Sequence, residues 1–328
     1  MKDNQESHFR FIDLFAGIGG IRLGLQSQGG RCVFSSEWDK DAQKTYAHNH
    51  GDQPVGDITQ VDTANIPDFD VLGAGFPCQP FSSIGKREGF RHPTQGTLFY
   101  DVVRIIEAKR PKAFLLENVE GLITHENGGT FQTILDSLAV SVNGQPILFP
   151  SPGHLGYHVY WKLLDSKHFG LPQSRVRVFI VGFDATLYED PSFRFPEKHA
   201  DLTPVGPYVE QGRTGYSISE HLQQSYLFKL EDGKPQLIDP CSDFPVKTLV
   251  SSYHKIQRLT GTFVRDEGSE TGIRLLSENE CKAIMGYPAD FEFPVSRTQM
   301  YRQLGNSVAV KVIEELAREM KAVFGSVG

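Results

Sequence analysis

A single cysteine stands at the point where a buried strand is expected to end. The apolar run 70–74 predicts that strand, which is followed by Gly75-Phe76-Pro77-Cys78-Gln79-Pro80-Phe81-Ser82. A cysteine held in such a turn is exposed, and its thiolate can act as a nucleophile. A lone cysteine is more commonly a buried structural residue. The choice between the two interpretations therefore depends on the other motifs of the chain.

A carboxylate follows a second buried strand. Ala113-Phe114-Leu115-Leu116 predicts the strand, and Glu117-Asn118-Val119 comes directly after it. Partial desolvation raises the pKa of a carboxyl group at such a place, which suits it to acid–base work. Ligand sites lie at the carboxyl ends of parallel strands, so we expect Cys78 and Glu117 to face one crevice. Taken alone, Glu117 is explained equally well as a salt-bridged or helix-capping acid.

A glycine-rich turn, Asp13-Leu14-Phe15-Ala16-Gly17-Ile18-Gly19-Gly20, lies where a first strand meets a first helix. Glycines at this junction let the backbone approach a ligand closely. Glu37 follows Gly17 by 20 residues, at the end of the next expected strand, where an acid binds ribose hydroxyls in nucleotide-binding folds. Arg22 occupies the third glycine position of the dinucleotide fingerprint, which favours an adenosine ligand without pyrophosphate. The alternative is a plain strand–turn–helix.

Two further segments carry polar side chains at informative places. Alternation along a strand puts Gln173, Arg175 and Arg177 on one face, where paired arginines can bind a carboxylate or phosphate. The alternative is that Arg175 and Arg177 are ordinary cations exposed to solvent. Gly305-Asn306-Ser307-Val308 precedes the last helix, and its polar residues suit either a helix cap or a ligand contact.

The elements that must position these residues alternate between strand and helix over residues 1–182. Strands are expected at 9–15, 31–36, 71–74, 113–116, 157–164 and 176–182, with helices ending near 28 and spanning 39–48 and 98–109. This alternation predicts an α/β fold with a mostly parallel sheet. Residues 1–184 would form one domain, completed by a helix within 303–328, and the Pro- and Gly-rich segment 185–302 a smaller loop-rich domain with short β pieces at 247–250 and 262–264.

Composition limits the setting and the partners. The four cysteines of the 328 residues form no CxxC pair, so neither zinc-site spacing nor a disulfide framework is present. The polar N-terminus and the absence of a long apolar run predict a soluble, cytoplasmic protein. A net charge of -7 argues against a nucleic-acid partner unless cations gather locally. They do so between Phe244 and Arg265, a stretch that lacks acids and is either a basic contact surface or an ordinary solvated one.

In this order, the motifs resemble those of the DNA cytosine-C5 methyltransferase family. The likeness covers most of the chain: Phe15 to Gly19, Pro77-Cys78-Gln79, Glu117-Asn118-Val119, Gln173 to Arg177, Arg274 to Pro288, and Gly305 to Val308. Length and layout are similar to those of the compact bacterial enzymes of restriction-modification systems. The resemblance implies a Rossmann-like, S-adenosylmethionine-dependent fold with a target-recognition domain at 185–302. It also implies a monomer that acts on double-stranded DNA, without metal or membrane, beside a separate restriction endonuclease where one exists.

The resemblance assigns roles to matching positions. Catalysis falls to Cys78 as nucleophile and to Glu117, Arg175 and Arg177 around the target cytosine. The S-adenosylmethionine site comprises Asp13, Phe15, Ala16, Gly17, Gly19, Gly20, Glu37, Trp38, Asp57, Ile58, Gly75, Pro77, Leu98, Asn306, Ser307 and Val308. Contacts to DNA are expected from Gln79, Ser82, Ser83, Lys86, Arg87, Asn118, Val119, Gln173, Thr248, Leu249, Tyr253, Lys255, Arg258 and Arg265. The segment from Ser82 to His92 is expected to close over the base.

Three other functions compete with this interpretation. A transfer-RNA cytosine methyltransferase would use the same motifs, but that branch usually carries Cys-Phe-Thr in its recognition region, which this chain lacks. An NAD-dependent oxidoreductase would leave Pro77-Cys78-Gln79 without a purpose. A catalytically silent DNA-binding protein would not need both Cys78 and Glu117. The sequence assigns no role to the stretch from Asn143 to His154 and names no DNA recognition sequence.

Overall fold

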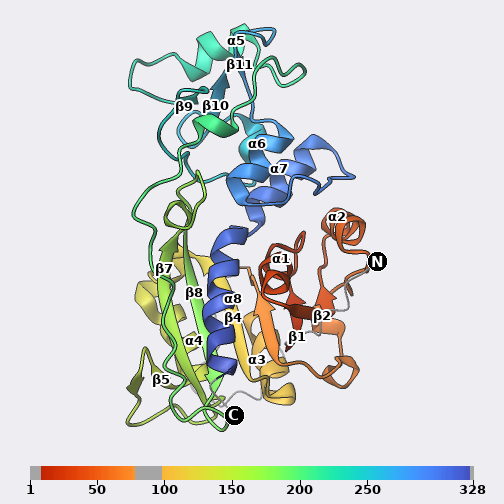
Figure 1. The fold of residues 1–328 in the computed structure, drawn as a ribbon, viewed down its shortest axis with the longest axis vertical. Coiled ribbons are helices and arrows are strands. Elements are labelled where there is room, and N and C mark those ends of the chain that lie inside the picture. Colours follow the sequence, from red (N-terminus) through yellow and green to blue (C-terminus); the bar gives the residue numbers. More distant parts are fainter. Residues whose placement is uncertain (1–8, 78–97, 326–328) are drawn as a thin grey trace.

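The computed structural model describes residues 9–77 and 98–325, and its largest element is a twisted sheet (Figure 1). The order of its eight strands is β2-β1-β3-β4-β8-β7-β5-β6. The strands are β1 (Phe9–Leu14), β2 (Gly30–Ser36), β3 (Val71–Ala74), β4 (Ala113–Val119), β5 (Ala139–Val142), β6 (Gln145–Pro146), β7 (Tyr157–Asp165) and β8 (Val176–Asp184).

The sheet is parallel in its first half and mixed in its second. β2, β1, β3 and β4 run parallel, whereas β8 is antiparallel to both β4 and β7. The expectation of a mostly parallel sheet is therefore right for the first four strands and wrong for the β8 region. The reason is local: β7 and β8 are joined by the short connection 166–175, which contains no crossover helix, so β8 returns beside β7 in the opposite direction.

Helices cover both faces of the sheet. α3 (Leu98–Lys109) and α4 (Gly129–Leu138) contribute to the apolar core on one face, and α1 (Gly20–Ser27) and α8 (Val310–Phe324) to the core on the other. α1 and α8 pack closely because Gly24 presents no side chain: a Cβ there would collide with Ile313 of α8. The last helix of the chain thus completes the first part of the fold, as the sequence predicts.

The rest of the chain builds a third apolar core at one end of the long axis (Figure 1). It contains a small sheet of order β11-β10-β9, formed by β9 (Gln236–Ile238), β10 (Thr262–Arg265) and β11 (Ile273–Arg274). Its helices are α5 (Glu220–Leu222), α6 (Glu278–Met285) and α7 (Arg297–Asn306). The predicted β piece at 262–264 is confirmed. The one at 247–250 is wrong, because the segment beside it makes only an isolated bridge between Val246 and Gln173.

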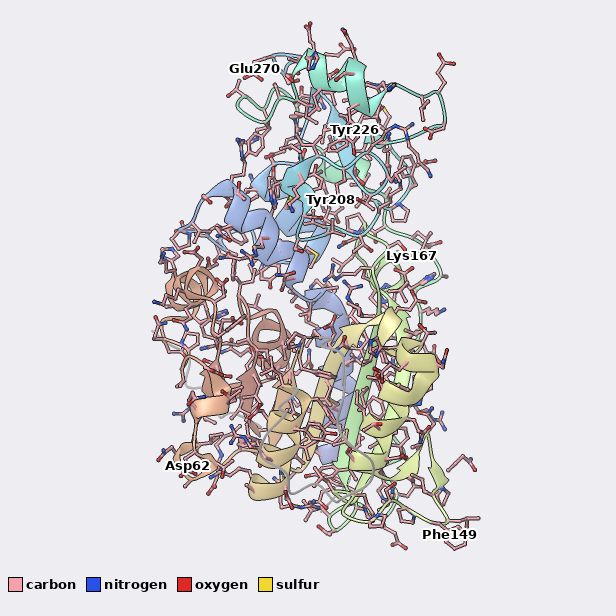
Figure 2. All side chains as sticks on the ribbon, turned by 180° about the vertical axis from the view of Figure 1, so that it is seen from behind. Asp62, Phe149, Lys167, Tyr208, Tyr226 and Glu270 are labelled. Atoms are coloured by element: carbon pink, nitrogen blue, oxygen red, sulfur yellow. The ribbon has the colours of Figure 1, made fainter. Side chains whose placement is uncertain are left out.

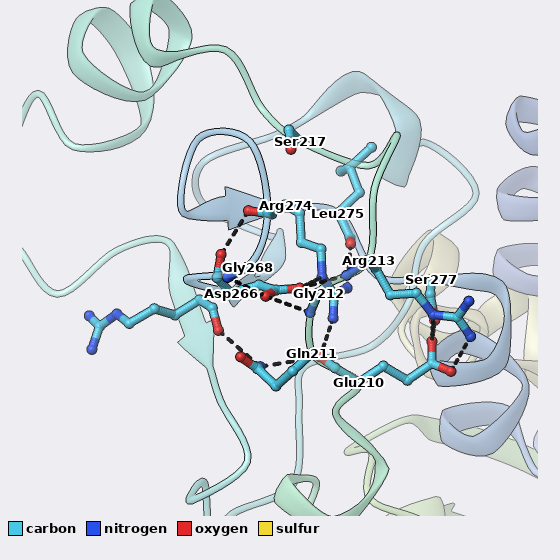
Figure 3. Close-up of polar contacts among 12 residues, drawn as sticks. Glu210, Gln211, Gly212, Arg213, Ser217, Asp266, Gly268, Arg274, Leu275 and Ser277 are labelled. Atoms are coloured by element: carbon cyan, nitrogen blue, oxygen red, sulfur yellow. Dashed lines mark hydrogen bonds and ion pairs between the residues drawn. The ribbon is translucent and has the colours of Figure 1, made fainter.

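A buried carboxylate fixes the loops of this small sheet. Asp266 is fully buried and accepts hydrogen bonds from the backbone N–H groups of Gly212, Arg213 and Gly268 (Figure 3). Its other partner is the buried guanidinium of Arg274, whose Nε lies 2.7 Å from Asp266 Oδ2. Arg274 also forms two bonds to Glu280 in α6. A buried pair is tolerated only when its remaining donors and acceptors are satisfied in this way.

The stretch that the sequence left without a role forms an edge hairpin. β6 pairs antiparallel with β5 at the end of the sheet. Leu148 and Phe149 follow it and are 85% and 92% exposed. Figure 2 shows Phe149 at the opposite end of the molecule from Glu270, which lies beside the small sheet. The hairpin is therefore remote from the small sheet.

Candidate active site

A cavity of about 760 Å³ lies where the carboxyl ends of β1, β2, β3 and β4 meet α7. It falls within the range of roughly 300–1,000 Å³ typical of sites for small molecules and cofactors. The sequence predicted this place from the strand ends. The structure joins in one cavity the glycine turn, the acid after β2, the acid near the end of β4 and the residues before α8.

One end of the cavity is shaped for a nucleoside. Glu37 is buried, and its two carboxylate oxygens accept hydrogen bonds from Gly17 N and Asp39 N, both at 2.8 Å. Burial raises the pKa of Glu37, and these amide bonds oppose the shift. Trp38 lines the cavity with its side chain 80% exposed, so the indole offers a flat apolar face. Asp57 and Ile58 line the same end, and Asp57 caps the turn that follows by accepting from Thr59 N.

The glycine turn is held by a histidine that the sequence analysis missed. Gly17 and Gly19 have φ values of 56° and 87°, which favour glycine. A Cβ at Gly19 would collide with His50, at the end of α2 (Lys40–His50), whose Nε2 lies 3.2 Å from Ile18 O. Burial lowers the pKa of His50 to about 4, so the neutral ring donates to this carbonyl. The available sequence signal was the spacing of Tyr46 and His50 on one helix face.

The other end of the cavity holds a carboxylate between two arginines. Glu117 lies in the buried run of β4, and its Oε1 lies 3.2 Å from Arg177 Nε. Burial raises the pKa of Glu117, while Arg177 and then Arg175 lower it. Both arginines line the cavity, so the alternative of solvent-exposed cations is excluded for Arg175 and Arg177. A carboxyl group whose pKa is raised by burial suits proton transfer.

Arg175 ties three parts of the chain together. Its guanidinium donates to Leu249 O at 3.1 Å, Gly305 O at 3.1 Å and Ser307 O. These carbonyls belong to the segment 247–250, to α7 and to the residues before α8. The Nε of Arg175 is buried and bonds to no described residue. One donor of this otherwise structural side chain is thus available inside the cavity.

The segment that leads to the predicted nucleophile is anchored to β4. Asn118 is buried, and its Nδ2 donates to Phe76 O at 2.8 Å. Phe76 and Pro77 line the cavity, and so does Gly75, which lies beside Glu117. Cys78, Gln79, Ser82, Ser83, Lys86 and Arg87, together with the predicted closing segment, lie outside the described residues. The anchor nevertheless directs the chain into the cavity at Pro77, one residue before Cys78.

The cavity brings together most of the residues predicted to bind the cofactor. Its lining includes Phe15, Ala16, Gly17, Gly20, Glu37, Trp38, Asp57, Ile58, Gly75, Pro77, Leu98, Asn306, Ser307 and Val308. Two predicted residues stand apart from it. Asp13 is fully buried at the end of β1, where burial raises its pKa, and Gly19 is covered by His50. We assign both to the support of the turn.

The residues predicted to contact DNA divide into two groups. Asn118 and Val119 line the cavity. Gln173, Leu249 and Tyr253 are buried instead, and each bonds within the fold: Gln173 Oε1 accepts from Leu249 N at 2.7 Å, and Tyr253 Oη donates to Thr262 O at 2.7 Å. Thr248 Oγ1 donates to Ser174 O at 2.7 Å. The bonds of Gln173 and Thr248 join the segment 248–249 to the residues directly before β8, which include Arg175.

The basic stretch 244–265 is not uniform. Lys255 and Arg265 are exposed, as a DNA contact requires. Arg258 is different: it is 7% exposed, it donates to Leu227 O at 3.0 Å and Leu230 O at 3.2 Å, and it pairs with Asp232. We therefore assign Arg258 a structural role instead of the expected contact to DNA, because its guanidinium already bonds to partners within the fold.

α7 supplies a wall of which the sequence analysis predicted only Asn306. Gln299, Arg302, Gln303 and Asn306 all line the cavity. Their spacing of i, i+3, i+4 and i+7 puts them on one helix face, and this spacing was the sequence signal that was missed.

Among the described residues no group of three or more His, Cys, Asp or Glu side chains is placed to hold a metal ion. No helix in the same residues is long and apolar enough to cross a membrane.

The class of protein follows from this site. An α/β sheet presents an adenosine-type pocket, with an acid after β2 and an exposed indole, beside a carboxylate–arginine centre. The open space in front of Gly17, where an added Cβ would meet nothing within 4 Å, also fits a bound cofactor. These are features of a nucleoside-cofactor transferase. The model of the C-5 cytosine-specific DNA methylase family matches residues 9–322, and the chain belongs to that family. It is a DNA cytosine-C5 methyltransferase of restriction-modification type, and enzymes of this family use S-adenosylmethionine.

Relatives cover nearly the whole chain. Type II methyltransferase M.MspI of Moraxella sp is 54% identical over 99% of this chain and 73% of its own length. Type II methyltransferase M.BsuFI of Bacillus subtilis is 55% identical over 98% of this chain and 74% of its own length. The solved structure of Dnmt2 methyltransferase from S. pombe shares the fold, with a TM-score of 0.72, 20% identity and coverage of 98% of this chain and all of that one (100%).

Proposed function

We propose that this enzyme methylates C5 of a cytosine that has rotated out of a short specific sequence in duplex DNA, and that Cys78 forms a covalent bond to C6 of that base. One observation carries the proposal. The cofactor end and the Glu117–Arg177 end open into a single cavity, and Pro77 brings the chain to it directly before Cys78. The residues 185–302 would then serve as the target-recognition domain.

The cofactor end would hold an adenosine through complementary chemistry. Glu37 keeps free lone pairs that can accept from ribose hydroxyls, since each oxygen accepts one amide. Trp38 would stack on the adenine ring, and Asp57 would accept from its amino group. When bound, S-adenosylmethionine supplies the electrophilic methyl group.

The base end would make the weakly nucleophilic C5 reactive. The Cys78 thiolate adds to C6, and the C5–C6 double bond is lost. Its electron pair forms a C4–C5 double bond while N3 takes up a proton, so that C5 becomes the nucleophilic carbon of an enamine. Glu117 hydrogen-bonds N3 and the exocyclic amine and so stabilises the charge that develops on the ring. Arg177 holds the Glu117 carboxyl in place, and the free Nε of Arg175 would donate to O2. After C5 is methylated, a base removes its proton and the thiolate leaves, which restores the aromatic ring.

Access to C6 requires the cytosine to leave the helix. A stacked base in duplex DNA cannot be attacked at this atom, so the enzyme must rotate the nucleotide outward at a cost of a few kcal/mol. The cavity of about 760 Å³ has room for a nucleoside cofactor beside a single base. The buried contacts of Arg175 to Leu249 O and Gly305 O keep the recognition segment at its mouth.

The covalent step is tested with Cys78→Ser and duplex DNA that contains 5-fluorocytosine. Fluorine blocks removal of the C5 substituent, so the wild-type enzyme should form a stable adduct that survives denaturing electrophoresis. The variant should bind DNA and cofactor but form no adduct and lose nearly all turnover. Cys241→Ser is the matched control, because Cys241 is exposed and free. Wild-type-like methylation by Cys78→Ser would refute the assignment.

The substrate is tested by bisulfite sequencing of plasmid DNA from cells that express the enzyme. Protected cytosines within one recurring short sequence are expected. Transfer RNA is assayed in parallel as the competing substrate. Methylation of transfer RNA with unprotected plasmid DNA would reject duplex DNA as the substrate.

A further inference from the structure

An arginine at the rim of the cavity has no partner in the described part of the chain. Arg302 is exposed, lines the cavity from α7, and forms no hydrogen bond or ion pair with another described residue. Its neighbours on the helix are engaged. Gln303 accepts from Thr45 Oγ1 at 2.9 Å, and Arg297 donates to Gly215 O and lies over the ring of Tyr216. Arg302 is therefore a cation available to a ligand.

The packing of α7 places this arginine beside the recognition segment. Gly305, nearly one turn further along the helix, packs so tightly that a Cβ there would collide with the backbone of Ser251. Val250 and Ser251 line the cavity with Arg302, directly after Thr248 and Leu249. Residues three apart on a helix share a face. Arg302 thus lies where the recognition segment meets the mouth of the cavity.

The carboxylates of the cavity are already bound elsewhere. Glu37 accepts from two amides, Asp39 accepts from Asp41 N and Ala42 N as the cap of α2, and Glu117 pairs with Arg177. The fourth, Asp57, accepts from Thr59 N. None of them contacts Arg302. An exposed guanidinium without a carboxylate partner is suited to forked hydrogen bonds with a phosphate.

A nucleotide that rotates out of a duplex does so about its backbone, so its flanking phosphates remain at the mouth of the pocket that the base enters. From this geometry we propose that Arg302 binds a backbone phosphate next to the target cytosine. The assignment rests on the proposed function. It makes Arg302 a positioning residue that fixes the strand at the rim, in a protein whose net charge of -7 would otherwise repel DNA.

The test measures duplex affinity against salt concentration for Arg302→Gln, Arg302→Lys and a control, Arg318→Gln. The control also removes one exposed positive charge, but from α8, where Arg318 pairs with Glu315 and Glu319. The probe is a duplex with the sequence found by bisulfite mapping. Arg302→Gln should weaken binding roughly 3- to 10-fold and reduce the slope of log affinity against log salt by about 0.9, the value for one phosphate contact.

The remaining outcomes separate the alternatives. Arg302→Lys should restore the salt slope, and Arg318→Gln should leave it unchanged. Calorimetry without DNA should give an unchanged dissociation constant for S-adenosylmethionine in Arg302→Gln. An unaltered salt slope in Arg302→Gln would overturn the assignment. If the slope is unaltered and S-adenosylmethionine binds more weakly, Arg302 would be a cofactor contact instead of a phosphate contact. A wild-type enzyme that binds and methylates no DNA would overturn the proposed function itself.

Discussion

At the scale of single residues, the site depends on charged groups whose environments are set by burial. Glu117 and Glu37 both sit at strand ends, and burial raises the pKa of each. Their partners differ, because Glu117 faces an arginine and Glu37 faces backbone amides. The first arrangement suits proton transfer and charge stabilisation, whereas the second suits a fixed hydrogen-bond acceptor.

Replacement of Glu117 by Gln should lower kcat by about 10²- to 10⁴-fold, the usual contribution of a positioned acid or base, with a small change in KM. The amide keeps the shape of the side chain but cannot carry or release the proton. Steady-state kinetics on the mapped duplex checks this. Glu120→Gln is the control, because Glu120 is exposed in the turn that follows β4. Equal kcat values for wild type and Glu117→Gln would remove Glu117 from the chemistry.

Replacement of Glu37 by Ala should weaken the binding of S-adenosylmethionine by about 5- to 150-fold, equivalent to roughly 1–3 kcal/mol for two lost hydrogen bonds. Calorimetry gives the dissociation constant. The constant for Glu37→Gln should lie between those of the wild type and Glu37→Ala, because glutamine retains one acceptor oxygen. Thermal unfolding shows whether the Ala variant is folded. An unchanged dissociation constant in folded Glu37→Ala would contradict the ribose contact.

At the scale of elements, α2 and α7 shape the site although neither carries the chemistry. The end of α2 supports the glycine turn through His50, and the middle of α7 forms the rim of the cavity. The two helices contact each other through Thr45 and Gln303. Displacement of either helix would therefore be transmitted to the cofactor end.

The half-buried His50 of α2 predicts a dependence of stability on pH. His50 faces Arg22, Asp52, Tyr46 and Ile18 O, and desolvation followed by Arg22 lowers its pKa from 6.5 to about 4. Between these values the unfolded chain binds more protons than the folded protein, so stability falls as the pH drops from about 6.5 to about 4, by up to about 3 kcal/mol. Chemical denaturation at a series of pH values should show this loss. His50→Gln should reduce the slope by up to one proton, and an identical slope would disprove it.

At the scale of the whole molecule, the segment around Leu249 is joined to the residues before β8 by buried polar contacts. Arg175 donates to Leu249 O and to Gly305 O of α7. The side chain of Gln173 accepts from Leu249 N and donates to Ile284 O of α6. Such contacts fix the position of the segment relative to the cavity. The expectations of a monomer, a cytoplasmic location and a separate endonuclease stay predictions, which size-exclusion chromatography, localisation and cloning of neighbouring genes would examine.

The basic stretch should separate into binding and structural cations. The double substitution of Lys255 and Arg265 by Ala should weaken binding to DNA and reduce the salt slope by about 0.9 for each lost phosphate contact, with little change in melting temperature. Arg258→Ala should instead lower the melting temperature, because it leaves Asp232 and two carbonyls without their partner. Unchanged affinity, slope and site preference in the double variant would place recognition elsewhere in 185–302.

The sequence alone determined much of the fold and of the site. β3 and α3 agree with their predicted bounds, because their apolar residues and flanking turns are local properties. The rule that strand ends in a parallel sheet share an edge predicted one crevice for Cys78 and Glu117, and the resemblance to the family assigned Phe15, Glu37 and Asn306 to the cofactor site. The order of the motifs identified the family before any contact was known.

Only the tertiary structure decided which polar side chains are free to act. Arg258 and Arg302 cannot be told apart by residue type, yet one is buried against Asp232 and the other stands exposed at the cavity. The antiparallel course of β8, the support of the glycine turn by His50 and the three carbonyls around Arg175 depend likewise on segments far apart in the chain. Local patterns encode which face of an element is apolar, but burial and pairing between distant segments are fixed only when the elements pack.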